Sequence, residues 1–381
     1  MSRTTLAGLA KRSPWGFVGM VVLVLIVEAV IDGRAQSLFD MEDIAFRWTG
    51  RAATLKARQA QVLCFGDSLI KLGVIPSVVA ERTGKKVYNL ALSGSQAPTS
   101  YFLLKRALDS GARPEAVVVD FTPPLLRVGP RHITTRWGAM LNPVEAAELA
   151  WWARDADLFG EVALGHWIPS LRGKTTIRKN LREALAGGKP DTLAWNQLAV
   201  RNWNKNEGAQ LMVGSTAAQN LPDAEIQRLR EGYYPEWACH RANSEGIDHF
   251  LKLAEQHKIQ VYWVLAPVIT RLQDQMTRSG IDARHDEFLR SWQARYPNLV
   301  ILDARGKVPE LDAFWDPQHL SVVGASAFSR TLGDVLRQSL EKSLRPSWVA
   351  MPEIKVGPLA PGVENIIESR LALDASSQIR K

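Results

Sequence analysis

A serine that follows an apolar run is the residue best placed in this sequence to act as a nucleophile. The run covers residues 61–65, and Gly66-Asp67-Ser68 follows it directly. A turn from a buried strand into a helix exposes its side chain at the carboxyl edge of a sheet, and it directs free backbone N–H groups at whatever that side chain attacks. Such a triplet also arises by chance, so Ser68 needs partners elsewhere in the chain.

An acid and an imidazole lie three residues apart near the other end of the chain. Asp316 and His319 come after an apolar run at 299–303 and before an amphipathic segment at 324–340. In a parallel sheet this loop would lie at the same edge as Ser68. A histidine activates a serine by accepting its proton, and a carboxylate orients the histidine. We therefore expect Ser68 as nucleophile, His319 as base and Asp316 as acid.

These segments resemble the conserved blocks of the SGNH or GDSL family of serine hydrolases. Residues 65–69 resemble the nucleophile block, and 316–319 resemble the block that carries the acid and the base. Residues 87–95 resemble the block with an oxyanion glycine, here Gly94. The resemblance implies a flavodoxin-like fold, an oxyanion hole made by the backbone N–H groups of Ser68 and Gly94, and activity on ester bonds.

One block departs from the family pattern. After the strand expected at 116–120 the family has Gly-x-Asn-Asp, whereas residues 120–124 read Asp-Phe-Thr-Pro-Pro. The asparagine donor is missing, and losing one oxyanion donor costs on the order of a hundred- to a thousandfold in rate. Thr122 or Asn89 could replace it, although a structural role is favoured for Asn89. Asp67 is expected to stabilise the turn and cap the next helix rather than act as a catalytic acid.

Short apolar runs alternate with longer connections, which predicts a three-layer α/β/α sandwich. Residues 69–82 have helical spacing and end at Gly84, a suitable C-terminal cap. The SGNH-like domain is expected over 58–345, and residues 346–381 are expected to form a C-terminal tail. The five runs expected to form a five-stranded parallel sheet are 61–65, 87–92, 116–120, 260–266 and 299–303.

A large insertion is expected between the third and fourth strands, at about 125–245, because this segment is far longer than one crossover requires. Its composition predicts helices, and it could form a lid or a substrate platform beside the sheet edge. Its tryptophans could equally form a small core, and a core role is compatible with a lid or platform. The tryptophans of the insertion are Trp137, Trp151, Trp152, Trp167, Trp195, Trp203 and Trp237.

The first 35 residues are typical of a membrane anchor. Residues 15–31 are apolar apart from Glu28, which is near the lower length limit for crossing a hydrocarbon core about 30 Å thick. Basic residues before this segment predict a cytoplasmic N-terminus and an extracytoplasmic domain; they are Arg3, Lys11 and Arg12. A cleaved signal peptide is the alternative, since residues 33–35 resemble a cleavage site. An anchor is favoured.

Composition excludes several classes of protein. The chain of 381 residues is 46% hydrophobic and 23% charged, which excludes disorder throughout. Two cysteines, Cys64 and Cys239, cannot form a disulfide framework, and no motif predicts a metal or another cofactor. The net charge of +8 suggests anionic partners, but the expected topology separates the protein from nucleic acid. The densest basic run could bind lipid head groups or an acidic glycan, or could be a solvated helix face; it comprises Arg172, Lys174, Arg178, Lys179 and Arg182.

Together these features predict a single-pass membrane protein with an extracytoplasmic serine esterase or acyltransferase domain. Expected substrates are acyl or acetyl esters, such as those of envelope glycans or lipids. Hydrolysis and acyl transfer differ only in the hydroxyl that accepts the acyl group, so the motif does not separate them. The alternative is a catalytically inactive envelope protein that keeps the fold as a binding or scaffold module.

Overall fold

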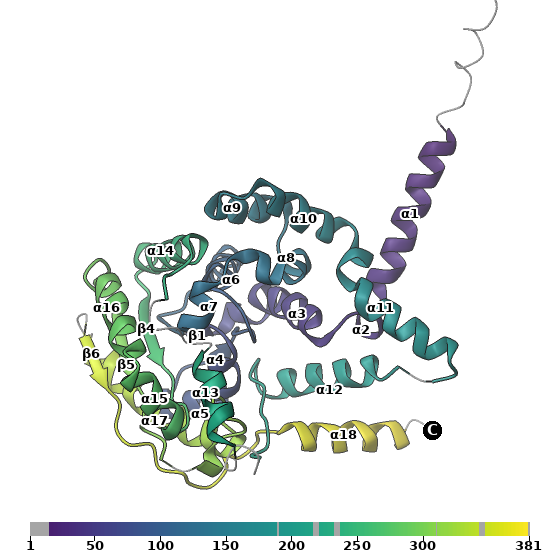
Figure 1. Ribbon diagram of the computed structural model, residues 1–381. Helices are drawn as coiled ribbons and strands as arrows, with labels where there is room; N and C mark the ends of the chain where they lie inside the picture. Colours follow the sequence, from purple (N-terminus) through teal and green to yellow (C-terminus); the bar gives the residue numbers. More distant parts are fainter. Residues whose placement is uncertain are drawn as a thin grey trace, which may run out of the picture.

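A computed structural model describes residues 15–188, 190–215, 221–231, 237–309, 311–342 and 347–379. Six parallel strands form one sheet in the order β2-β1-β3-β4-β5-β6 (Figure 1). The five expected strands are all present, but the expectation of a five-stranded sheet is wrong. The strands are β1 (Val62–Phe65), β2 (Val87–Asn89), β3 (Ala116–Val119), β4 (Gln260–Leu265), β5 (Leu299–Asp303) and β6 (Ser347–Ala350).

The central strands are apolar throughout because both faces of the sheet are covered. Successive side chains of a strand point to opposite faces. Leu63 and Phe65 accordingly lie in one hydrophobic cluster, whereas Val62 and Cys64 lie in the other. Cys64 is a buried free thiol, as expected from its place in the strand.

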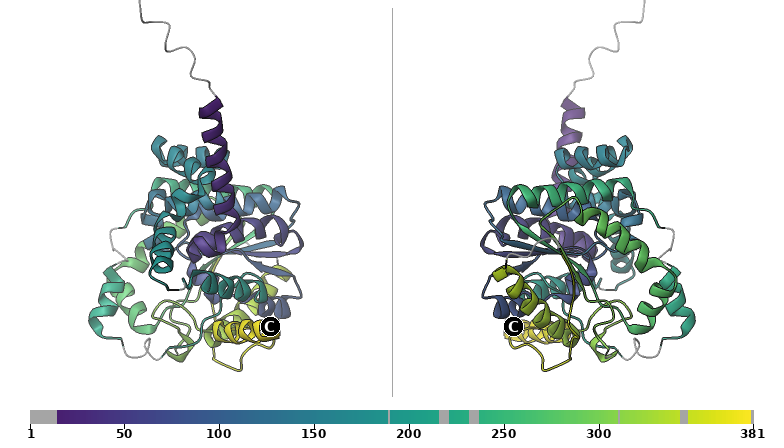
Figure 2. Two further views of the ribbon diagram at one scale, coloured as in Figure 1. Left: turned by 90° about the vertical axis from the view of Figure 1, so that its right-hand side faces the viewer. Right: turned by 90° about the vertical axis from the view of Figure 1, so that its left-hand side faces the viewer.

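Two layers of helices form these clusters with the sheet, so the α/β architecture is confirmed (Figure 2). One layer comprises α3 (Met41–Leu55), α6 (Ala97–Asp109), α14 (Arg241–Gln256) and α16 (Ile281–Gln293). The opposite layer comprises α4 (Ser68–Gly73), α5 (Pro76–Thr83), α15 (Thr270–Arg278) and α17 (Val322–Lys342).

The direction in which strands are added reverses at β1. The chain passes from β1 to β2 on one side, and β3 to β6 then follow on the other side. In sheets of this kind, ligands bind in the crevice at the carboxyl ends of the strands flanking the reversal, here β1 and β3. Ser68 and Thr122 follow these two strand ends.

The helix expected at 69–82 is divided into α4 and α5. Proline disfavours helical geometry in the residue before it, and Ile75, which precedes Pro76, has an extended backbone with ψ of 108°. α4 is therefore a short helix that carries only the first turns after Ser68. Gly84 ends α5 in a left-handed conformation with φ of +70°, as the sequence predicts.

The insertion between β3 and β4 is helical. Trp137, Trp152, Trp203 and Trp237 are buried, whereas Trp151, Trp167 and Trp195 are exposed, so its tryptophans serve both as core and as surface residues. Its helices before α14 are α7 (Pro123–Arg127), η2 (Pro130–Ile133), α8 (Thr134–Met140), α9 (Pro143–Ala153), α10 (Ala156–Trp167), α11 (Pro169–Leu185), α12 (Thr192–Lys205) and α13 (Asp223–Glu231). Elsewhere the chain forms η1 (Ala57–Gln59) and η4 (Leu311–Ala313).

An apolar helix, α1 (Trp15–Gly33), projects from the domain and is followed by the short α2 (Ala35–Leu38) (Figures 1 and 2). Its 19 residues, about 28 Å at 1.5 Å per residue, make it long and apolar enough to cross a membrane. Glu28 anchors its lower part, because its carboxylate accepts hydrogen bonds from the backbone N–H and the hydroxyl of Ser170 on α11. The basic residues Arg3, Lys11 and Arg12 lie outside the described residues.

The segment expected to be a tail contributes to the sheet and to the surface. β6 pairs with β5 at the edge of the molecule away from α1. The chain then returns across the domain, and α18 (Ile366–Ile379) lies beside α12 (Figure 1). Three side chains of β6 are partly buried and Ala350 is exposed. Residues 348–351 form a short apolar run, but this segment was expected to belong to the tail.

Candidate active site

The turn after β1 places Ser68 at the start of α4. Gly66 has φ of +120°, a backbone conformation that glycine adopts readily. A Cβ atom at Gly66 would lie 1.8 Å from Oδ1 of Asp120, so any side chain is excluded by space as well as by conformation. Asp67 caps α4 by accepting a hydrogen bond from the backbone N–H of Leu69 at 2.8 Å, which matches its expected role.

Ser68, His319 and Asp316 lie in hydrogen-bonding contact. Oγ of Ser68 is 2.7 Å from Nε2 of His319, and Nδ1 of His319 is 2.7 Å from Oδ2 of Asp316. The hydroxyl and the imidazole come from positions 251 residues apart in the chain. The structure therefore brings together all three residues of the expected triad, in the order of contacts that the expected roles require.

The loop before α17 holds the acid and the imidazole. Phe314 and Leu320 form an antiparallel bridge that closes this loop. Inside it, Oδ1 of Asp316 accepts hydrogen bonds from the backbone N–H groups of Gln318 at 2.8 Å and His319 at 2.9 Å. Burial opposes the ionisation of Asp316, but these bonds and the contact with the imidazole prevail, so the pKa of its carboxyl lies below the ordinary value. Asp316 is thus a carboxylate over the pH range in which a histidine titrates.

The second expected oxyanion residue, Gly94, lies in a turn that is bonded to the nucleophile turn. The hydroxyl of Ser95 donates to the carbonyl oxygen of Gly66 at 2.8 Å, and the backbone N–H of Leu92 donates to the same oxygen at 3.0 Å. Gly94 has φ of +65°. Among the described residues, no acceptor takes the backbone N–H of Ser68 or Gly94, so both N–H groups are free to bind an oxyanion.

Neither candidate for the missing third donor is free. The hydroxyl of Thr122 donates to Oδ2 of Asp67 at 2.7 Å, which uses its single proton. The amide of Asn89 is fully buried and donates to the carbonyl oxygens of Ile70 and Val74. Asn89 therefore has the structural role that the sequence analysis favours, and Thr122 supports the turn.

Asp120 occupies the position where the departure from the family pattern begins. Its Oδ1 accepts the backbone N–H of Asp67 at 2.9 Å, directly beneath the nucleophile turn. Burial and the neighbouring carboxylate of Asp67 raise the pKa of Asp120 well above its ordinary value. Burial and the carboxylate of Asp67 therefore disfavour the ionised form of Asp120 beneath Ser68.

Arg136 on α8 is a positive group beside the oxyanion turn that sequence reasoning did not identify. Its Nη1 would lie 2.9 Å from a Cβ atom placed on Gly94, and its guanidinium also pairs with Glu42 on α3. A guanidinium in this place can stabilise negative charge that develops near Gly94. Arg136 lies in the insertion, where no motif marks its position relative to the sheet edge.

A small cavity adjoins the site at the ends of β3 and β4. It has a volume of about 40 Å³, and its lining includes Leu69, Thr122 and Val264. A much larger cavity of about 730 Å³ is lined by none of the three triad residues. Choosing a candidate site by cavity volume alone would therefore miss the triad. Among the described residues, no group of three potential ligands could hold a metal ion.

A scan against protein-family models found no match, and neither did a search of curated proteins.

Proposed function

We propose that this protein is a serine hydrolase or acyltransferase of the SGNH type that acts on ester bonds. The observation that supports this proposal best is the unbroken series of contacts from the hydroxyl of Ser68 through the imidazole of His319 to the carboxylate of Asp316. An isolated serine hydroxyl is a weak nucleophile, whereas a serine bonded to an oriented imidazole is activated for attack on a carbonyl carbon.

In the first half of the reaction, Oγ of Ser68 attacks the ester carbonyl while Nε2 of His319 accepts the hydroxyl proton. The negative charge on the carbonyl oxygen is stabilised by the backbone N–H groups of Ser68 and Gly94. The tetrahedral intermediate then expels the alcohol, which takes its proton from the imidazolium. The acyl group remains bonded to Oγ of Ser68.

In the second half, His319 accepts a proton from water or from an acceptor hydroxyl, which attacks the acyl-serine. The new tetrahedral intermediate then releases Oγ of Ser68, which takes its proton back from the imidazolium. Water gives hydrolysis, and another hydroxyl gives acyl transfer. The third oxyanion donor of the family is absent, which would cost on the order of a hundred- to a thousandfold in rate. The guanidinium of Arg136 beside Gly94 offers positive charge in partial compensation.

The substrate class follows from the expected place of the domain. If α1 crosses the bilayer with its N-terminus in the cytoplasm, the site lies outside the cytoplasm. Acyl or acetyl esters of envelope glycans or lipids are the substrates in reach there.

A fluorophosphonate probe tests nucleophile activation without knowledge of the substrate. We expect the full-length protein in nonionic detergent to become labelled, and we expect no labelling of Ser68→Ala. His319→Ala should also lose labelling while its thermal unfolding temperature stays within about 2 °C of the wild-type value, since the imidazole is part of the surface loop. Ser291→Ala, which removes an exposed hydroxyl from α16, serves as the matched control and should label normally.

Two outcomes would contradict the proposal. Labelling that persists in Ser68→Ala would assign the reactive hydroxyl to another residue. A folded wild-type protein that never becomes labelled would favour the alternative of an inactive binding or scaffold module, which the missing asparagine motivates.

A further inference from the structure

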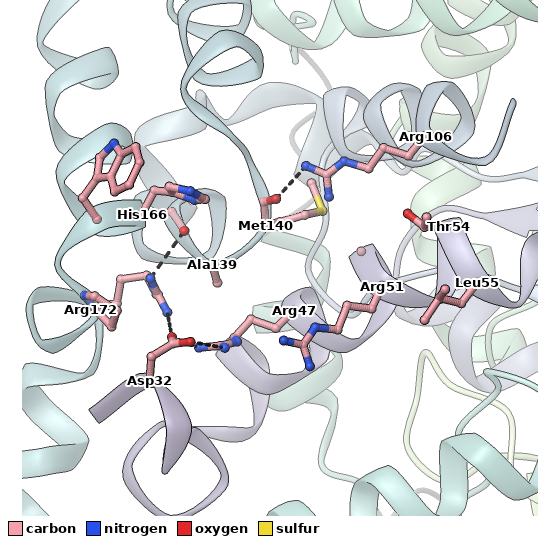
Figure 3. Close-up of a pocket in the computed structure, with 14 residues that line it drawn as sticks. Asp32, Arg47, Arg51, Thr54, Leu55, Arg106, Ala139, Met140, His166 and Arg172 are labelled. Carbon is pink, nitrogen blue, oxygen red and sulfur yellow. Dashed lines mark hydrogen bonds and ion pairs between the residues drawn. The ribbon is translucent and has the colours of Figure 1, made fainter. Parts of the chain in front are cut away.

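The largest of the cavities described above lies where α1 enters the domain. It has a volume of about 730 Å³ and is bordered by α1, α3, α6, α8, α10 and α11 (Figure 3). Its lining contains four arginines and one acidic residue; these are Arg47, Arg51, Arg106, Arg172 and Asp32. Such a concentration of guanidinium groups suits a ligand with a phosphate or a carboxylate.

Three of these arginines already pair with carboxylates. Nη2 of Arg47 is 2.8 Å from Oδ2 of Asp32, and Arg172 pairs with Asp43 at 2.9 Å. Nε of Arg106 is 2.9 Å from a carboxylate oxygen of Glu145.

Arg51 differs from the other three arginines. It makes no hydrogen bond or ion pair with any residue that the structure describes, and its side chain is exposed. Its guanidinium lies at the cavity beside that of Arg47 (Figure 3). Arg51 is attracted to Asp32 only at longer range, and that carboxylate is already hydrogen-bonded to Arg47. The four arginines of the lining thus outnumber the three carboxylates that pair with them, which are Asp32, Asp43 and Glu145.

The cavity also has an apolar border. Leu55 is 70% exposed and Trp167 is 63% exposed, and both line the cavity together with Met140 and Pro169. Leu55 lies at the end of the cavity near Arg51, whereas His166, the neighbour of Trp167, lies at the other end (Figure 3). Tryptophan in particular is enriched at membrane surfaces, where its ring spans apolar and polar surroundings.

The position of the cavity relates it to the membrane. Asp32 belongs to the last turn of α1, and Glu28 on the same helix holds the start of α11 through Ser170. If α1 crosses the bilayer, its last turn lies at the membrane surface, and the cavity lies at the same level. An occupant with a negative head and an apolar chain would match both the guanidinium groups and the border.

We propose that this cavity binds the anionic head group of a membrane phospholipid, with the phosphate at Arg51 and an acyl chain against Leu55, which follows Arg51 by one turn of α3. The inference rests on the proposed placement of α1 in the bilayer, but not on the chemistry of Ser68. The same guanidinium groups could take phosphate from a soluble ester. The experiment below distinguishes the two sources.

Binding is measured by isothermal titration calorimetry on the full-length protein in nonionic detergent, with three probes. They are dihexanoyl phosphatidylglycerol, dihexanoyl phosphatidylcholine and glycerol 3-phosphate. We expect the phosphatidylglycerol to bind at least about tenfold more tightly than either of the others. Arg51→Gln should weaken that binding by about tenfold, because it removes a charge-assisted hydrogen bond. Arg51 is exposed, so the variant should fold normally.

Arg178→Gln is the matched control, since it removes the same charge from the exposed face of α11 outside the cavity. Its affinity should stay within twofold of the wild-type value, as should that of Ser68→Ala, which separates this inference from the proposed catalysis. Equal binding of glycerol 3-phosphate and phosphatidylglycerol would overturn the lipid assignment. Equal binding of both lipids would overturn recognition of an anionic head group, and an equal loss in Arg178→Gln would overturn the cavity as the site.

Discussion

Asp316 combines two structural tasks in one side chain. Its Oδ1 holds the loop through two backbone N–H groups, and its Oδ2 contacts Nδ1 of His319. An ionised carboxylate accepts a hydrogen bond from Nδ1, which leaves Nε2 without a proton and able to accept the proton of Ser68. The position of one proton on the imidazole therefore decides whether the serine is activated.

Asp316→Asn should preserve the conformation of the loop but move the ring proton of His319 from Nδ1 to Nε2. The amide oxygen can still accept the backbone N–H groups, whereas the amide NH₂ would face Nδ1 and place the ring proton on Nε2. We expect the rate of fluorophosphonate labelling to fall on the order of a thousandfold with little change in thermal stability. The second-order labelling rate, compared with that of wild type, measures this effect.

Asp312→Asn provides the matched control, because Asp312 lies on the same loop with its side chain exposed. It should label at the wild-type rate. A wild-type rate in Asp316→Asn would mean that Asp316 does not orient the base.

At the scale of single residues, the sequence identifies candidate site residues that belong to a short motif. It does not identify residues that lie beside the site only because of tertiary packing. Ser68, Asp316 and His319 were predictable because each lies in a short pattern next to a strand or helix. Arg136 was not, since its place beside Gly94 depends on how the insertion packs on α3. The raised pKa of Asp120 was not predictable either, because it results from burial and from the neighbouring carboxylate of Asp67.

At the scale of helices and strands, α3, α4 and α12 pack around the buried side chain of Lys71. Lys71 on α4 is 1% exposed, and its Nζ has no hydrogen-bond partner among the described residues. The ammonium lies 5.6 Å from the ring centroid of Trp48 and 5.0 Å from that of Trp203. Cation–π contacts favour the charged form, but burial outweighs them and lowers the pKa of Lys71 to about 7.

Lys71→Met should stabilise the protein at neutral and acidic pH. Below pH 7 the folded wild-type protein must bury an ammonium, while the unfolded chain keeps it in water. Wild-type stability should therefore rise as the pH increases from about 7 to about 10.5, where the unfolded lysine also loses its proton. We expect the variant to be more stable by about 2–4 kcal/mol at pH 6, with the difference shrinking towards pH 10.

Thermal unfolding of both proteins across this pH range measures the difference, and other titrating groups cancel in the comparison. Lys56→Met is the control, because Lys56 is an exposed lysine at the end of α3. It should change stability by less than about 0.5 kcal/mol at every pH. A pH-independent difference between wild type and Lys71→Met would show that Lys71 is not the titrating group.

The strands were predictable from sequence to different degrees. β1 and β3 are buried on both faces and contain only apolar residues. β4 and β5 are also buried apolar runs, apart from the partly buried Gln260 and Asp303 at one end of each. β6 lies at the edge with side chains that are partly buried or exposed. Its apolar run at 348–351 comes after the last long helix, where a tail was expected, so it was not recognised as a strand. Pro76 indicates the break between α4 and α5 in the sequence. The helical spacing of apolar residues continues across this break, so one continuous helix was expected.

At the scale of the whole molecule, α3 connects the apolar helix to the candidate site. Arg47 on α3 pairs with Asp32 at the end of α1, and Glu42 near the start of α3 pairs with Arg136 beside Gly94. The other face of α3 packs into the hydrophobic cluster on the sheet. α3 therefore pairs with both the end of α1 and the arginine beside Gly94, which relates the candidate site to the membrane if α1 crosses it.

The C-terminal segment completes the edge of the sheet that lies away from α1. β6 covers β5, and the chain beyond it buries Met351 and Ile354 almost completely. Asn202 and Asn206 on α12 then donate hydrogen bonds to the carbonyl oxygen of Glu364. Residues expected from sequence to be an appended tail therefore contribute to the core and to the order of the insertion.

Truncation after Lys342 should destabilise the domain by at least about 4 kcal/mol, since it exposes apolar surface that Met351 and Ile354 cover and removes their own burial. It also leaves β5 as an unpaired edge, which favours association between copies. Thermal unfolding and size-exclusion chromatography in nonionic detergent measure both effects.

Truncation after Asn365 is the control. It removes α18 but keeps β6, Met351 and Ile354, so most of the stability and the monodisperse profile should remain. If both truncations were equally harmless, β6 would not be needed to complete the sheet, and the fold would depend on the five strands that the sequence identifies.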